Sequence, residues 1–365
     1  MNISIRFTAI CIAVLLIFPA LLNACSCFLI ENDGNVVVGR NFDWFSGDAV
    51  VLVNKHGVTK YALVMPPDTP ANWQSRYGSI TVNQIGRDWP MEGINEAGLF
   101  VANLWLSETV YPEPDQRPAV SDLQWIQYQL DVNKSVDEVI SSDSVIRIAK
   151  TSTPLHFFVA DAEGNAAVIE FIDGRQVVHA GKDMPYRTIT NSTYDNSLQF
   201  LQEQDIFGGD SAFVQSSRSR NRFVEVASRI EEYSKQDSEP ITDYATGILD
   251  SVKIPKQDGW SCMYDITGKT MSFKSVESPE IRTVDITSFH FDCSFPVQYI
   301  DLETDKVGDV TSLFKDYTVD MNIKQAFECF KIYSENGVAE NTPESVIEAI
   351  ARQPFGFECV SGGEK

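Results

Sequence analysis

The 365-residue sequence contains only four histidines, and it lacks the short motifs that usually accompany metal or nucleotide chemistry. There is no H-E-x-x-H, no glycine-rich phosphate loop and no G-x-G-x-x-G. The G-x-S-x-G motif of many serine hydrolases is missing as well. A Cys–His or Ser–His–Asp arrangement of residues distant in sequence stays open. We nevertheless expect no metal and no cofactor, and the shortage of histidine favours a catalyst that works without it.

Basic residues are also scarce, with 29 Lys and Arg against 51 Asp and Glu, which gives a formal net charge of −22. A chain this acidic repels other polyanions, so we expect neither nucleic acid nor an anionic membrane as partner. A solvated acidic surface without a specific partner is the simpler explanation of the excess.

Cysteines are too few for a disulfide scaffold, and no pair has the C-x-x-C spacing of a metal site. Cys262 lies in an apolar, strand-like run and is expected to be a buried thiol. Cys329 and Cys359 lie in the C-terminal segment and could pair in an oxidising compartment.

The first 24 residues have the features of a secretory signal peptide. Arg6 supplies the positive charge, Phe7–Leu22 is almost wholly apolar, and the small residue Ala24 precedes the expected cut. The apolar run is interrupted by Pro19 and is shorter than the roughly 20 residues of a membrane span, and no later stretch is long enough. We therefore expect a periplasmic or secreted protein without a membrane span. Loss of Arg6 would change its net charge from −22 to −23.

Cleavage before Cys25 would leave a residue whose α-amine and thiol titrate near ~8 and ~8.5, so a nucleophile would carry its own base. The alternative is that Leu22-Asn23-Ala24-Cys25 is a lipoprotein cleavage site. In that case Cys25 would be an acylated anchor of a protein that binds a ligand without turnover.

The segment after Cys25 predicts a β-hairpin with an Asn32-Asp33-Gly34 turn. With a two-residue turn, residues whose numbers sum to 67 face each other, so Cys25 opposes Phe42 and Arg40 is its diagonal neighbour. Asp43 follows, where its carboxylate could hold the new α-amine while Arg40 lowers the pKa of the thiol. An ordinary Arg40–Asp43 salt bridge is the alternative.

Further along, strands and helices alternate in groups, which indicates antiparallel sheets covered by helices in a layered α+β domain over residues 25–295. Strands are expected at 49–55 and 60–65 as a second hairpin, and at 155–160, 166–172, 175–180, 261–265, 270–275 and 281–286. Helical spacing marks the stretch from Leu123 to Leu130 and residues 221–233 and 241–252. Two helices, 323–334 and 343–352, are expected in a C-terminal extension, residues 296–365, that resembles an appendage.

Several short motifs resemble the choloylglycine hydrolase family of N-terminal-nucleophile amidases, which includes bile salt hydrolases and penicillin V acylases. In family order they are Cys25-Ser26-Cys27-Phe28, Gly39-Arg40-Asn41-Phe42-Asp43, Gly93-Ile94-Asn95-Glu96-Ala97-Gly98-Leu99, Thr190-Asn191-Ser192, Asn221-Arg222-Phe223 and Ser261-Cys262-Met263-Tyr264-Asp265. The ordered set is specific, although each motif alone is weak. The resemblance implies a four-layer αββα fold, hydrolysis of a small-molecule amide and a homo-oligomer, a tetramer in relatives.

The same resemblance implies roles for individual residues. Cys25 would be the nucleophile, with Arg40 and Asp43 positioning its thiol and amine. Asn191 would donate its side-chain amide to the oxyanion, and Arg222 would complete the charged site. Taken alone, Asn191 is a turn residue in a glycosylation sequon, and Arg222 is a solvated helix residue with Arg218 and Arg220 as nearby alternatives.

Two tryptophans depart from the bile salt hydrolase pattern. Trp105 stands where those enzymes have an asparagine whose backbone helps to form the oxyanion hole, and Trp44 follows Asp43 directly. Both could be core residues, but the pair is similar to penicillin V acylases of Gram-negative bacteria. Two indoles suit aromatic or apolar acyl groups. We therefore expect phenoxyacetyl penicillins and N-acyl homoserine lactones as substrates, with conjugated bile salts, or acyl transfer to an amine, as alternatives.

Overall fold

The structure is a computed structural model, and it describes residues 24–150, 153–203, 218–233, 239–255, 257–339 and 342–360. Residues 1–23, which make up nearly all of the expected signal peptide, lie outside the described residues.

Two large sheets form the centre of the described chain. The first consists of β1 (Ala24–Asn32), β2 (Asn35–Trp44), β14 (Thr188–Ile189), β15 (Asp258–Asp265), β16 (Thr270–Ser275), β17 (Arg282–Asp285) and β19 (Gly308–Asp309), in the order β14-β1-β2-β15-β16-β17-β19. The second consists of β3 (Val50–Asn54), β6 (Ser79–Asn83), β7 (Glu92–Asn95), β8 (Phe100–Trp105), β11 (Leu155–Ala160), β12 (Ala166–Ile172), β13 (Arg175–Ala180), β18 (Gln298–Asp301) and β20 (Lys315–Asp316), in the order β13-β12-β11-β8-β7-β6-β3-β18-β20. Smaller sheets join β4 (Val58–Tyr61) to β5 (Asn72–Gln74) and β21 (Glu358–Cys359), and β9 (Ala119–Val120) to β10 (Arg147–Ile148).

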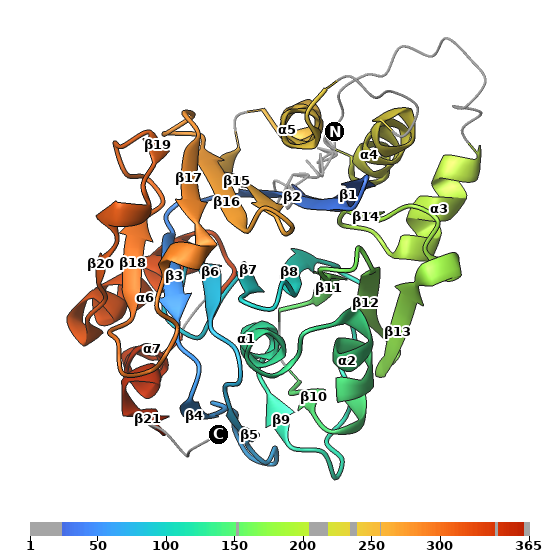
Figure 1. Ribbon diagram of the computed structural model, residues 1–365. Helices are drawn as coiled ribbons and strands as arrows, with labels where there is room; N and C mark the ends of the chain where they lie inside the picture. The colour runs from blue at the N-terminus through green and yellow to red at the C-terminus, as the bar shows by residue number, and fades with distance from the viewer. Residues whose placement is uncertain are drawn as a thin grey trace, which may run out of the picture.

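Helices cover the outer faces of both sheets. The α-helices of the described residues are α1 (Asp122–Val132), α2 (Val136–Ser141), α3 (Tyr194–Glu203), α4 (Ser219–Tyr233), α5 (Ile241–Val252), α6 (Val319–Glu335) and α7 (Glu344–Arg352). Figure 1 shows α4 and α5 above the first sheet and α1 and α2 below the second, with the two sheets face to face. The predicted α+β class and αββα layering are therefore confirmed. One apolar cluster fills the space between the sheets, and a smaller one joins Phe28 and Val37 of the first sheet to Val226 and Leu249 of the helices.

The N-terminal hairpin follows from its turn residues. Asp33 and Gly34 have φ angles of 50° and 79°, the left-handed conformation that a two-residue type I′ turn requires. The register then pairs Cys25 with Phe42 and Cys27 with Arg40, as the sequence predicted. On the other edge of β2, Gly259 lies opposite Asp43 with φ 120°, and a Cβ there would come within 1.8 Å of the Phe42 carbonyl oxygen. Glycine therefore allows β15 to approach β2 beside Asp43.

One expectation is wrong, and one cysteine pairing that the sequence left open does not form. The strands around His56-Gly57 do not form a hairpin, because β3 pairs with β6 and β18 whereas β4 pairs with β5 and β21. The sequence left open a pairing of Cys329 with Cys359, but Cys359 is bonded to Cys293. Cys329 is a buried free thiol on α6. β21 pairs with β4, which places Cys359 opposite Val58 and next to Gly57, and Cys293 Sγ lies 3.3 Å from the carbonyl oxygen of Gly57. Cys262 is a buried free thiol, as predicted.

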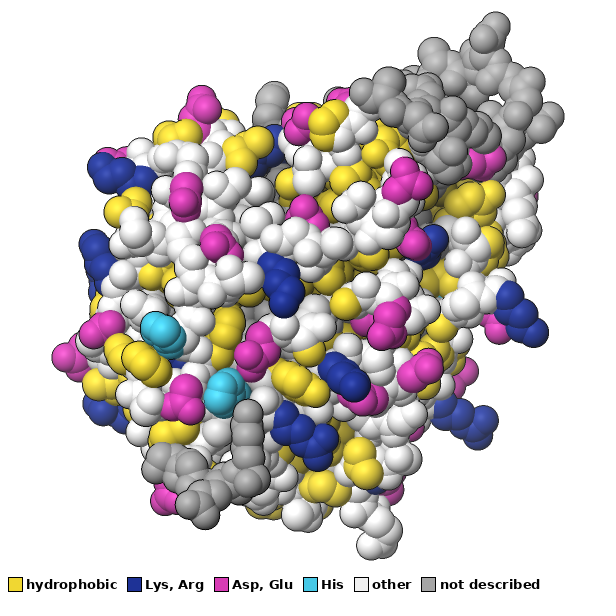
Figure 2. All heavy atoms as spheres, in the orientation of Figure 1, with side chains coloured by type: hydrophobic (Ala, Val, Ile, Leu, Met, Phe, Trp, Pro, Cys, Tyr) yellow, Lys and Arg dark blue, Asp and Glu magenta, His cyan; other side chains and the backbone are white. Residues whose placement is uncertain are grey.

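The C-terminal residues return to the body of the protein. β18 pairs with β3, so the second sheet includes residues beyond 295. The helices expected at 323–334 and 343–352 are α6 and α7. Among the described residues, no helix is both long enough and apolar enough to cross a membrane. Acidic and basic side chains are interspersed over the face seen in Figure 2, and no large basic patch lies on it.

Candidate active site

Cys25 lies at the second position of β1 and is only 2% exposed. It faces Phe42, and Ala24 faces Asp43 across the hairpin. The nitrogen of Cys25 therefore enters the site at the end of the hairpin that carries the Asp43 carboxyl group.

Asn191 connects the nucleophile to the second sheet. Its Oδ1 accepts a hydrogen bond from the backbone nitrogen of Cys25 at 2.6 Å, and its Nδ2 donates to the carbonyl oxygen of Trp105 at 2.9 Å. An amide nitrogen carries two hydrogens, so one remains for a further acceptor. The asparagine of the sequon thus lies at the candidate nucleophile.

Arg222 is the second long-range contributor, from the first turn of α4. It is 1% exposed; Nη1 donates to Ser26 Oγ at 2.7 Å and to the carbonyl oxygen of Cys25, and Nη2 donates to Asn191 Oδ1 at 3.0 Å. Arg218 and Arg220 are exposed, so Arg222 is the arginine of this group that the structure brings to Cys25.

Arg40 is paired with a residue that the sequence analysis did not identify. Its Nε donates to Glu92 Oε2 at 2.6 Å, and both side chains are fully buried. Tyr264 Oη and Trp260 Nε1 donate to the other oxygen of Glu92 at 3.1 and 3.4 Å. The alternative of an Arg40–Asp43 salt bridge is thus replaced by a buried Arg40–Glu92 pair. The only sequence signal for Glu92 was an acidic residue inside the apolar run before Gly93-Ile94.

Asp43 is buried, and only one of its two carboxylate oxygens has a hydrogen-bond partner among the described residues. Its Oδ1 accepts a hydrogen bond from the nitrogen of Ile254 at 3.4 Å, and its Oδ2 has no hydrogen-bond partner among the described residues. Burial raises the pKa of Asp43 to about 7, although the charge of Arg222 opposes the shift. A positive group that arrived beside Oδ2 would favour the carboxylate.

The thiol of Cys25 is not activated by its surroundings alone. Burial raises its pKa, and the positive charge of Arg40 offsets only part of that effect. Arg40 thus lowers the pKa of the Cys25 thiol, as predicted, but in the chain that retains Ala24 the effect of burial is larger. A base close to the sulfur is needed to form the thiolate.

A further buried pair, His156 and Glu170, holds the segment that contains Asn191. His156 Nε2 is 2.9 Å from the carbonyl oxygen of Thr190, and its Nδ1 is 3.3 Å from Glu170 Oε1. The same carboxylate oxygen accepts from the nitrogen of Tyr194 at 2.9 Å. Burial opposes ionisation, but the imidazoles of His156 and His179, which lie 3.3 and 3.6 Å from the carboxylate oxygens, lower the pKa of Glu170 to about 2. These contacts fix the backbone at both ends of residues 190–194. The sequence analysis had assigned no role to His156.

A cavity of about 890 Å³ opens beside Cys25. Phe42, Trp44 and Trp105 line it near the sulfur, and the two indole centroids lie 5.9 Å apart. Trp44 is buried and Trp105 half-buried. The structure therefore brings together all seven residues singled out from the sequence: Cys25, Arg40, Asp43, Trp44, Trp105, Asn191 and Arg222.

Known proteins resemble this chain in both sequence and structure. The family model for linear amide C–N hydrolases of the choloylglycine hydrolase family matches residues 25–299. A penicillin V acylase of Pectobacterium atrosepticum is 26% identical, with 72% of this chain and 80% of that protein covered. The structure of a penicillin V acylase from Agrobacterium tumefaciens has a TM-score of 0.70 at 25% identity, covering 81% of this chain and 98% of that one. A conjugated bile acid hydrolase from Clostridium perfringens shares the fold, with a TM-score of 0.64 at 17% identity over 78% of this chain and 98% of that chain.

The match to the family model includes Cys25 and most strands of the two large sheets, and it extends over most of the chain. This protein belongs to the choloylglycine hydrolase family of linear amide C–N hydrolases.

Proposed function

We propose that this chain is an exported cysteine amidase that hydrolyses the phenoxyacetyl amide of penicillin V and also N-acyl homoserine lactones. The observation that carries the proposal is the 2.6 Å contact between Asn191 Oδ1 and the nitrogen of Cys25. In the chain that retains Ala24 this atom is a peptide nitrogen. Removal of residues 1–24 would convert it into an α-amine, which is the base that the buried thiol lacks.

The first half of the reaction forms a thioester. The α-amine takes the proton of the Cys25 thiol, and the sulfur bonds to the carbonyl carbon of the substrate. The carbonyl oxygen becomes an oxyanion, which accepts hydrogen bonds from the second hydrogen of Asn191 Nδ2 and from a backbone N–H beside Trp105. Donors of this kind are each worth about 2.7–4 kcal/mol in the transition state. The C–N bond then breaks, and the ammonium of Cys25 returns its proton to the departing amine.

The second half restores the enzyme. A water molecule gives a proton to the α-amine and bonds to the thioester carbon through its oxygen. The C–S bond breaks, the sulfur regains a proton from the ammonium, and the carboxylic acid leaves. Asp43 Oδ2 has no hydrogen-bond partner within the part of the chain that the structure describes, so it can hold the ammonium that forms in each half.

The acyl group is proposed from the walls of the cavity. Trp44 and Trp105 present two indole rings beside the sulfur, at an interplanar angle of 39°. Stacking and apolar burial on such rings favour a phenoxy ring or an alkyl chain. The two penicillin V acylases that match this chain at 26% and 25% identity support the same choice.

Intact mass tests the processing step. The mass expected for the mature protein corresponds to a free Cys25 at the N-terminus. A chain that starts elsewhere, or that carries an acyl group on Cys25, would remove the mechanism and favour the lipoprotein alternative.

A turnover panel of penicillin V, an acyl homoserine lactone and glycocholate tests the substrate. We expect hydrolysis of the first two, its loss in Cys25→Ser, and a fall in kcat/KM in Trp44→Ala and Trp105→Ala. Preferred turnover of glycocholate would replace the proposal with the bile salt alternative. Transfer of the acyl group to an added amine in preference to water would identify an acyltransferase.

A further inference from the structure

The cavity beside Cys25 has a far wall that lies outside the residues matched by the family model. The near wall contains Phe42, Trp44 and Trp105, but the far wall comes from α6, α7 and three described residues between these helices. Its lining residues are Phe330, Tyr333, Val338, Ala339, Thr342, Val346 and Ile350. The family match ends at residue 299, so this wall is a feature of this chain that family membership does not predict.

The wall is firmly docked on the second sheet and its loops. Gln325 Nε2 donates to the carbonyl oxygen of Asn83 at 2.8 Å, and Asn322 Oδ1 accepts from the nitrogen of Arg87 at 2.8 Å. At the end of α7, Gln353 Nε2 donates to the carbonyl oxygen of Tyr61 at 2.6 Å. Contacts at both ends make α6 and α7 a preorganised surface for a ligand.

Tyr333 joins this wall to the catalytic end of the cavity. Its hydroxyl donates to Gln84 Oε1 at 2.8 Å, and Gln84 Nε2 donates to the carbonyl oxygen of Ser46 at 2.9 Å. The ring of Tyr333 meets Trp44 edge-on, with centroids 6.4 Å apart, and Phe45 at 5.4 Å. The position of α6 therefore supports the indole beside the nucleophile.

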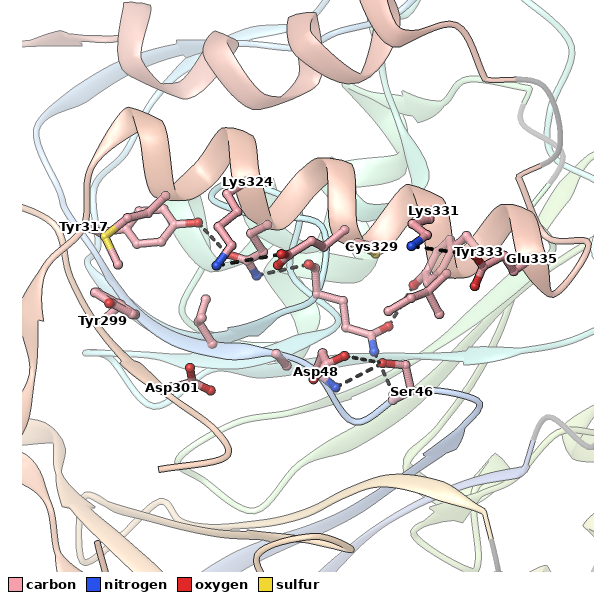
Figure 3. Close-up of a pocket in the computed structure, with 17 residues that line it drawn as sticks. Ser46, Asp48, Tyr299, Asp301, Tyr317, Lys324, Cys329, Lys331, Tyr333 and Glu335 are labelled. Atoms are coloured by element: carbon pink, nitrogen blue, oxygen red, sulfur yellow. Dashed lines mark hydrogen bonds and ion pairs between the residues drawn. The ribbon is translucent and has the colours of Figure 1, made fainter. Parts of the chain in front are cut away.

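The two sides of α6 differ in chemistry. Its other side faces a second hollow of about 630 Å³, which Lys324, Lys331 and Glu335 line together with Asp48 and Asp301 (Figure 3). The side that faces Cys25 carries Phe330 and is continued by Val338. An apolar ligand is therefore better accommodated on the Cys25 side.

We propose that α6 and α7 form the binding wall for the acyl chain, and that Phe330, Val346 and Ile350 set the longest chain the enzyme accepts. The inference rests on the amidase proposed above and adds its substrate class, amides of straight-chain acids longer than phenoxyacetic acid. A volume of about 890 Å³ lies near the upper end of the range of about 300–1,000 Å³ for small-molecule sites, so a phenoxyacetyl group leaves space beyond it.

The polarity of the cavity decides which half of the amide occupies it. Four charged residues line the cavity. Asp68 forms an ion pair with Arg147, and Asp122 is buried at the start of α1. Glu113 and Lys150 are 73% and 62% exposed, so they lie at the solvent edge. The amine half of a penicillin or a homoserine lactone is polar and suits this edge. The hydrocarbon half gains most from contact with Phe330 and Ile350, because burial of apolar area is favourable.

The proposal is tested with larger side chains on α7 that reduce the space at the far wall of the cavity. Val346 and Ile350 lie four residues apart on one face of α7, and Val346 is 43% exposed, so a larger ring at 346 can be accommodated without disturbing the core. Val346→Trp should lower the ratio of kcat/KM for dodecanoyl- over butanoyl-homoserine lactone by about tenfold or more, because pockets discriminate between chains that differ by methylene groups to this extent. Ile350→Phe is the second variant and should shift the same ratio in the same direction.

Glu348→Trp is the matched control, because it places the same ring on the outer face of the same helix, where Glu348 is exposed. The ratio should stay at the wild-type value in this variant. An equal change in Val346→Trp and Glu348→Trp, or no change in either Val346→Trp or Ile350→Phe, would overturn the proposal.

A binding measurement separates this proposal from the proposed function. Isothermal titration of Cys25→Ser with dodecanoic and butanoic acid reports on the wall even if the wild-type chain hydrolyses no amide in the panel. Tighter binding of dodecanoic acid, weakened about tenfold or more by Val346→Trp, supports the wall. Equal affinity for the two acids would overturn it, whatever the outcome of the turnover panel.

Discussion

The side-chain oxygen of Asn191 lies 2.6 Å from the nitrogen of Cys25, and the side-chain nitrogen of the same residue donates to the carbonyl oxygen of Trp105. One amide group thus links the candidate nucleophile in the first sheet to the end of β8 in the second. The sequence analysis expected Asn191 only as a donor to an oxyanion. Its Oδ1 atom also accepts a hydrogen bond from the nitrogen of Cys25, which would become the α-amine that acts as the base.

Replacement of Asn191 separates these two tasks. Asn191→Ala removes both the acceptor for the amine and the donor for the oxyanion, so kcat should fall by about 10²–10³ with a smaller change in KM. Asn191→Asp keeps an acceptor but has no N–H, so its kcat should also remain low. Steady-state kinetics with Asn196→Ala, an exposed position on α3, provide the control. Wild-type kcat in Asn191→Asp would show that Asn191 is not a donor in the transition state.

The buried Arg40–Glu92 pair should matter for stability. Glu92→Gln leaves the guanidinium of Arg40 without its countercharge in a fully buried position, which costs about 3–5 kcal/mol in free energy of unfolding. Denaturant unfolding measures the loss. Glu348→Gln breaks an exposed pair with Arg352 and should cost about 0.5 kcal/mol or less. Similar losses in both variants would contradict the burial argument.

Asp43 should make stability depend on pH in the chain that retains Ala24. Its pKa of about 7 in the folded protein lies above the ordinary value near ~3.9, so folding disfavours its charged form. The stability contributed by the protonated group is complete below about pH 4 and is lost as the pH rises to about 7. Asp43→Asn avoids this loss, so its advantage over wild type should grow between about pH 4 and 7 by at most about 4 kcal/mol.

Denaturant unfolding at several pH values measures this difference between wild type and Asp43→Asn. After removal of residues 1–24, the ammonium of Cys25 should favour the carboxylate of Asp43, so the advantage of Asp43→Asn should shrink. An advantage that is independent of pH in the Ala24-containing form would show that Asp43 is ionised there throughout.

The Cys293–Cys359 disulfide closes a loop with a sequence separation of 66, for which the chain-entropy model gives about 4 kcal/mol. Cys359→Ser should lower the free energy of unfolding by about that amount and abolish the response of stability to a reductant. Cys329→Ala should keep the response to the reductant, because Cys329 is a free thiol. Loss of the response to the reductant in Cys329→Ala would contradict the Cys293–Cys359 disulfide and favour the Cys329–Cys359 pairing that the sequence left open.

Local features were predictable because they depend on neighbours in the chain. The positive φ angles of Asp33 and Gly34 select one hairpin turn, and that turn determines which residues of β1 and β2 face each other. The strands at 155–160, 166–172 and 175–180 were found at their observed bounds, since apolar, β-branched runs between turn residues identify strands. The order of the short motifs was sufficient to identify the family. The resemblance also placed Asn191 and Arg222 among the candidate catalytic residues.

The amino-acid sequence alone therefore determined the class of fold, the hairpin that presents Cys25 and the kind of chemistry. Only the tertiary structure decided that Glu92 pairs with Arg40, that Cys293 is the partner of Cys359, and that α6 and α7 line the cavity. The physical reason is distance along the chain. Local dihedral preferences and hydrophobic periodicity are set within a few residues, whereas partners separated by 52 or 66 positions are selected by burial and packing of the whole chain.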